Sequence, residues 1–150
     1  MFGAARASLR GALALLALPT GSVLATTGKR TSRPAERAWV ERAAALALAA
    51  KRSVEVAEFR RDIDAHRVAL RRIVQAHPNP PEPVLKLHRV MVLTNALLHA
   101  AAECHVGGRI VCPADLMQHI EDQVRNGFEH LHALEAGSRR GGGEAPRRPA

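Results

Sequence analysis

Apolar residues in the middle of the chain recur with the period of an α-helix. The recurrence by threes and fours runs over residues 56–73, 84–101 and 116–131. Such spacing places the apolar side chains on one side of a helix, so each stretch predicts an amphipathic helix. Residues 43–50 are alanine and leucine on almost every face, which favours helix by intrinsic propensity. No stretch alternates apolar and polar residues as a half-buried strand does, so the pattern predicts an all-α protein.

Turn signals divide these helices. The prolines of residues 79–83 cannot continue a helix. Further on, Gly107 and Gly108 tolerate positive φ, and Pro113 suits the first position of a new helix. Residues 82–135 therefore predict a helical hairpin, which Gly137 would end. Together with a helix over residues 35–76, which becomes two helices if residues 51–53 break it, the hairpin predicts a small three- or four-helix bundle.

The two cysteines lie at the mouth of the turn in this hairpin. Cys104 is at the end of the first helix, and Cys112 is immediately before the second. A disulfide between them would close a loop of about nine residues, which the chain-entropy model values at roughly 2.5 kcal/mol. We expect this disulfide at the turn. The alternative, two unpaired cysteines, depends on the redox state of the compartment.

The start of the chain is typical of a secretory signal peptide. Residues 1–25 have Arg6 and Arg10 before a short apolar core, no acidic residue, and a small-residue ending at Ala25. We expect export to a bacterial periplasm or secretion; the alternatives are an uncleaved signal that anchors the chain to a membrane, and a mitochondrial transit peptide. The predicted organisation is a signal peptide at 1–25, a linker at 26–33, a helical domain at 34–136 and a disordered basic tail at 137–150.

Charge is distributed unevenly along the chain. The net charge is +8, but all of it comes from the segments before residue 34 and after residue 136, so the predicted domain is neutral. A nucleic-acid reader concentrates Lys and Arg on a structured face, so we expect no specific nucleic-acid partner. The arginine-rich tail is either solvated or makes weak contact with an anionic surface.

The eight histidines raise the question of a metal site. Zinc sites usually contain two ligands at short spacing, such as CxxC or HxxxH, and the sequence has neither. We therefore expect no metal and no other cofactor. The alternative is a periplasmic metal-binding protein that uses His66, Cys104, His105 and Cys112.

The sequence lacks the common motifs of catalysis. It contains no GxSxG, no glycine-rich phosphate loop, no CxxCH and no CxxC. We therefore expect a non-enzymatic accessory protein that acts by protein–protein interaction, with a partner protein or with itself, through the long amphipathic helix. The predicted interaction face is the regular apolar stripe of that helix: Val56, Phe59, Ile63, His66, Leu70 and Ile73.

Overall fold

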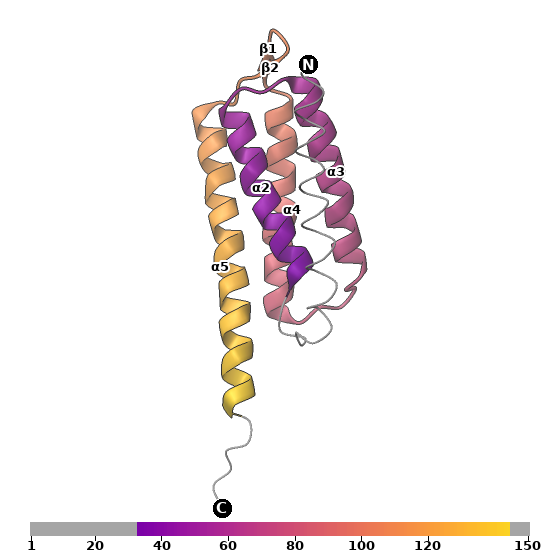
Figure 1. The fold of residues 1–150 in the computed structure, drawn as a ribbon, viewed down its shortest axis with the longest axis vertical. Helices are drawn as coiled ribbons and strands as arrows, with labels where there is room; N and C mark the ends of the chain where they lie inside the picture. Colours follow the sequence, from indigo (N-terminus) through magenta and orange to yellow (C-terminus); the bar gives the residue numbers. More distant parts are fainter. Residues whose placement is uncertain (1–32, 145–150) are drawn as a thin grey trace, which may run out of the picture. The chain divides into compact units, whose positions relative to one another are not determined.

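A computed structural model describes residues 33–144 of the chain. Over these residues the elements are four α-helices and a two-stranded hairpin: α2 (Pro34–Lys51), α3 (Val56–Gln75), α4 (Glu82–Ala102), β1 (His105–Val106), β2 (Arg109–Ile110) and α5 (Ala114–Glu144) (Figure 1). This confirms the all-α prediction in its four-helix form. The predicted signal peptide at 1–25, and the predicted linker apart from Arg33, lie outside the described residues.

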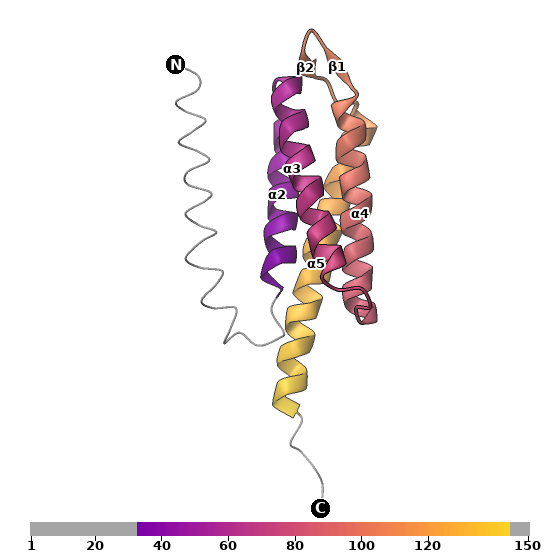
Figure 2. The same ribbon diagram turned by 90° about the vertical axis from the view of Figure 1, so that its right-hand side faces the viewer.

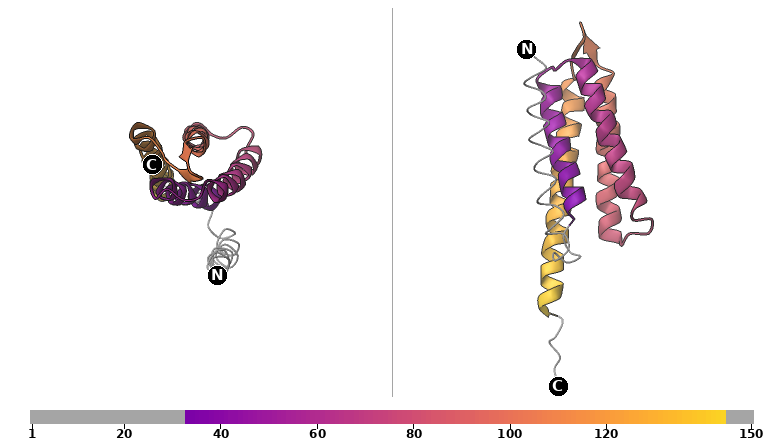
Figure 3. Two further views of the ribbon diagram at one scale, coloured as in Figure 1. Left: turned by 90° about the horizontal axis from the view of Figure 1, so that it is seen from above. Right: turned by 45° about the vertical axis from the view of Figure 1, so that its right-hand side comes forward.

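The four helices run alternately up and down as a bundle. Helices α3, α4 and α5 each lie antiparallel to the helix before them, and α4 packs on both α3 and α5 (Figures 1 and 2). Helix α2 lies beside α3 and α5, as the view along the bundle shows (Figure 3). Short connections of this kind make consecutive helices antiparallel neighbours.

The core lies between the four helices and is built from the predicted apolar stripes. Its largest fully buried side chains come from every helix and from β2: Val40, Phe59, Ile63, Leu87, Met91, Leu98, Ile110, Ile120 and Leu131. Helix α2 approaches α5 closely at Gly127, where an added Cβ would lie 3.1 Å from a methyl group of Val40. The glycine therefore permits this close contact between the two helices.

The first long helix does break at the position that the sequence left open. Ser53 adopts a left-handed conformation with φ of 54°, between the end of α2 and the start of α3. A residue other than glycine rarely adopts this conformation, so the turn is under local strain. Without this reversal α2 and α3 would form one rod and could not share a core.

A β-hairpin that the sequence did not predict closes one end of the bundle. Gly107 and Gly108, both with positive φ, form its two-residue turn. Two backbone hydrogen bonds join it to the α2–α3 connection: the Val56 N–H donates to the Gly108 oxygen at 2.8 Å, and the Ile110 N–H donates to the Val54 oxygen at 2.9 Å. The connections α2–α3 and α4–α5 are thus hydrogen-bonded to each other.

The last helix is longer than the sequence suggested. Helix α5 continues through Gly137 to Glu144, beyond the ends of the other three helices (Figures 1 and 2). The predicted start of a disordered tail at residue 137 therefore falls inside a helix. A helical glycine costs only about 1 kcal/mol relative to alanine, so Gly137 alone does not oblige α5 to end, and the glycines at residues 141–143 come only in its last turn. Residues 145–150 of the predicted tail lie outside the described residues.

Candidate functional site

The predicted interaction face lies inside the bundle. Four of its residues are buried and two are partly buried: Phe59, Ile63, His66 and Leu70, and then Val56 and Ile73. These side chains hold α3 against the neighbouring helices. The periodic stripe is therefore not a surface that the bundle offers to another molecule, and the protein–protein interaction itself stays a prediction.

His66 is joined to Trp39 of α2 by stacking and by two hydrogen bonds. The two rings are 3.9 Å apart between centroids and 13° from parallel. The Trp39 Nε1–H donates to the His66 backbone oxygen at 2.9 Å, and His66 Nε2 lies 2.9 Å from the Trp39 backbone oxygen. A carbonyl oxygen only accepts, so Nε2 carries the proton of the neutral ring and Nδ1 carries the lone pair. Burial, as the largest cause, lowers the pKa of His66 to about 4, so the ring is neutral at pH 7.

The predicted disulfide between Cys104 and Cys112 is wrong, because both thiols are free. The Val111 N–H donates to the Cys104 oxygen at 2.7 Å, continuing the register of the hairpin, so Cys104 stands opposite Val111. Cys112 is one residue beyond that position, and successive residues of an extended chain point to opposite faces. The hairpin therefore keeps the two side chains out of register for a bond.

The alternative set of metal ligands is not assembled in one place. His66 lies in the middle of α3, whereas Cys104, His105 and Cys112 lie around the hairpin. Burial raises the pKa of the Cys112 thiol, which disfavours the thiolate that binds metals. In the part of the chain that the structure describes, no group of three or more His, Cys, Asp or Glu side chains is placed to hold a metal ion.

Glu36 and His88 form a buried contact between α2 and α4. Glu36 Oε2 lies 2.9 Å from His88 Nε2, and the two side chains are only 3% and 5% exposed. A buried carboxylate is costly unless it is paired, so this contact fixes the start of α2 against α4. Sequence reasoning missed it because a glutamate in the first turn usually faces solvent. The helical spacing did indicate that Glu36 is buried, because it places Glu36 on the same side of α2 as Val40 and Ala43.

The outer surface of α4 is apolar over more than half of its length. Between Arg89 and Glu103 the exposed residues are Val92, Leu93, Ala96 and Ala100, which we call the α4 strip. Val92 is 51% exposed and Leu93 is 46% exposed. Surface helices normally carry charged or polar residues on their outer side. Sequence reasoning missed this strip, although residues 90–102 contain no Asp, Glu, Lys or Arg, and that absence was the available signal.

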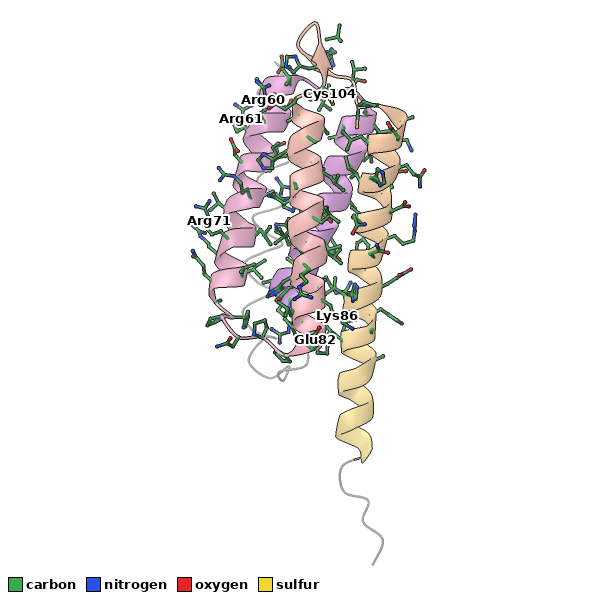
Figure 4. All side chains as sticks on the ribbon, turned by 180° about the vertical axis from the view of Figure 1, so that it is seen from behind. Arg60, Arg61, Arg71, Glu82, Lys86 and Cys104 are labelled. Carbon is green, nitrogen blue, oxygen red and sulfur yellow. The ribbon has the colours of Figure 1, made fainter. Side chains whose placement is uncertain are left out.

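The α4 strip continues into a groove beside the proline-rich α3–α4 connection. Val92, Leu93 and Ala96 line this groove with Val74 and Leu85, and its lining is mostly apolar. Arg89 lines the groove, and Figure 4 shows Arg71 in the second half of α3 and Lys86, with Glu82 beside it, near the start of α4. Arg60 and Arg61 lie at the other end of α3, near the hairpin. Within residues 33–137, Arg71 and Lys86 form no ion pair with a carboxylate, so the surface beside the strip is basic.

Comparison with family models, with curated proteins and with solved structures finds no match to this chain. None of the helices within residues 33–144 combines the length and the apolar character needed to cross a membrane.

Proposed function

We propose that this chain is an exported helical accessory protein that acts by binding another protein, and that the α4 strip is its binding surface. The observation that supports this is the absence of charge on the exposed side of α4 from Val92 to Ala100. A contiguous apolar surface on a helix is typical of a site that another protein covers. Catalysis forms no part of this proposal.

The strip offers enough apolar area to contribute usefully to binding. Fully burying a valine or leucine side chain stabilises by about 1.5–3 kcal/mol, so covering the half-exposed Val92 and Leu93 contributes about 1.5–3 kcal/mol together. Ala96 and Ala100 have short side chains, which let the backbone of a partner helix approach α4 closely. The groove next to the strip provides room for a larger apolar side chain of the partner.

The charges around the strip favour one kind of partner. Arg71, Lys86 and Arg89 flank it, so an acidic rim on the partner would be attracted to this surface. A second copy of the chain would bring the same basic residues toward each other across a two-fold contact, and like charges there oppose binding. We therefore propose a partner helix with an apolar face and an acidic rim.

Export is the second part of the proposal, and it rests on the pattern of residues 1–25 alone, since the free thiols do not call for an oxidising compartment. The test is the intact mass and N-terminal sequence of the protein isolated from fractionated cells of its host. A chain that begins at Thr26 in the periplasmic or secreted fraction would support export. A chain that keeps Met1, or that is recovered from the cytoplasm, would contradict it.

The binding surface can be tested by site-specific photo-crosslinking in the native host. A photoreactive amino acid replaces Leu93 in one variant and Leu48 of α2 in the other; both leucines are 46% exposed, so they form a matched pair. We expect a crosslinked protein at position 93 that is absent at position 48, that disappears when Val92→Ser is added, and that weakens as the salt concentration rises. Equal products at both positions, or none at 93, would refute the α4 strip. A product of twice the chain's mass would show self-association and refute the acidic partner.

A further inference from the structure

A second groove, between α2 and α3, has a different chemical character from the α4 strip. It is open to solvent and has a volume of about 330 Å³. Trp39 and His66 form its floor, and four alanines, two from each helix, form its walls. Because alanine side chains are short, the trough between the helices stays open. The volume is within the usual range for sites that bind small molecules.

Two arginines line this groove without a counter-charge. No Asp or Glu is among its lining residues, and within residues 33–137 neither Arg42 nor Arg72 forms an ion pair with a carboxylate. The groove between α2 and α5 differs, because there Glu121 and Glu129 line the same surface as the basic residues. An apolar trough with only positive charge favours an organic anion.

The floor contributes a hydrogen-bond acceptor that nothing in the described residues uses. His66 is 5% exposed, and its Nδ1 is buried without a hydrogen-bond partner. The other ring nitrogen, Nε2, is occupied by the Trp39 backbone oxygen. A buried acceptor without a partner costs about 1–3 kcal/mol, so this ring position lowers the stability of the α2–α3 contact.

The positions of the arginines set the length of the ligand. Arg42 lies close enough to His66 to influence its charge electrostatically. Arg72 lies six residues beyond His66 along α3, which is about 9 Å at the helical rise per residue. Arg42 lies three residues beyond Trp39 on the antiparallel α2, about 4.5 Å in the opposite direction. The backbones of the two arginines are therefore roughly 13–14 Å apart along the groove, and their flexible side chains can reach toward each other over the apolar walls.

We propose that the α2–α3 groove binds an elongated organic dianion, a molecule with an apolar middle and a carboxylate at each end. One carboxylate pairs with Arg42 and the other with Arg72, while the apolar middle lies on Trp39 and the alanines. This site is separate from the α4 strip and does not depend on the protein–protein interaction proposed above.

The test is calorimetric titration of the protein with octanedioate, an eight-carbon dicarboxylate of about the required length. We expect it to bind at least tenfold more tightly than octanoate, which has one carboxylate, or butanedioate, which is too short. Arg42→Gln and Arg72→Gln should each weaken binding at least tenfold. Arg71→Gln is the matched control, since Arg71 is the exposed neighbour of Arg72 and does not line the groove.

Circular dichroism and unfolding curves of the three variants would show that each folds as the unaltered protein does. Amide chemical shifts that move on titration should cluster on α2 and α3 around Trp39 and His66. No heat and no shift at millimolar octanedioate would overturn the proposal. Equal loss in the Arg71→Gln control would show a non-specific charge effect and overturn it, as would binding of octanoate with the same affinity.

Discussion

The buried imidazole of His66 makes the stability of the bundle depend on pH. In the unfolded chain the pKa of a histidine is 6.5, whereas burial against Trp39 lowers the pKa of His66 to about 4 in the folded protein. Between these two pH values His66 is protonated in the unfolded chain and neutral in the folded protein. The contribution of His66 to the free energy of unfolding is therefore highest above pH 6.5 and falls as the pH drops from about 6.5 toward 4.

The size of this effect follows from the difference between the two pKa values. One pKa unit corresponds to about 1.4 kcal/mol, so lowering the pH from 7 to 5 should remove about 2 kcal/mol of stability through this residue. The free energy of unfolding of a small domain is about 5–15 kcal/mol, so protonation of this one side chain removes a substantial part of it.

The assay compares urea unfolding at pH 7 and pH 5 for the unaltered protein and for His66→Gln. Glutamine cannot be protonated in this range, and its amide can still donate to the Trp39 oxygen. The variant should lose about 2 kcal/mol less than the unaltered protein between the two pH values, because it lacks the one side chain whose pKa differs by this much between the folded and unfolded states. The same loss in both proteins, or an NMR titration that gives His66 an ordinary pKa, would refute this reasoning.

Three further predictions concern the framework of the bundle. Glu36→Leu should lower the free energy of unfolding in urea by about 3–5 kcal/mol, because it leaves His88 buried and unpaired. Arg125→Ala is the control and should lower it by under about 1 kcal/mol, because the pair of Arg125 with Asp122 is exposed. Equal losses in the two variants would contradict the role given to Glu36. Ser53→Gly should raise the free energy of unfolding by about 1 kcal/mol, since glycine adopts the left-handed conformation without strain, and a loss of stability would show that the serine side chain matters more. Both cysteines should react with iodoacetamide in the native protein without reductant, and Cys112 should react more slowly because burial raises its pKa. A protein mass that is 2 Da lower before reduction than after it would show a disulfide and contradict the free thiols.

The helices could be predicted from the sequence because each carries a periodic apolar stripe long enough to be recognised. The hairpin at residues 105–110 could not, since strands of two residues show no alternation. Gly107 and Gly108 marked the reversal correctly, but not the register that separates Cys104 from Cys112. A glycine inside α5 was mistaken for its end because a local signal does not report how far a helix continues.

The surfaces were harder to predict than the fold. Periodicity identified the stripe from Val56 to Ile73 but could not say what covers it, and α2 and α4 cover it within the same chain. The α4 strip differs from this stripe because its residues Val92 and Leu93 are exposed and lie outside the core. What marked the strip in the sequence was the absence of charged residues in 90–102, and not a periodic spacing of apolar residues. The groove with Arg42 and Arg72 joins residues from two helices, so no linear pattern contains it.

The hydrogen bonds between the hairpin and the α2–α3 connection give the bundle a direction of opening. Val56 with Gly108 and Ile110 with Val54 tie the two helical pairs together at one end. At the other end the α3–α4 connection is rich in proline, which donates no backbone hydrogen bond. Amide hydrogen exchange should therefore be fastest at the end of α3 and in the α3–α4 connection and slowest next to the hairpin. Local opening then begins at the proline end of α3, while the buried Glu36–His88 contact still holds α2 against α4.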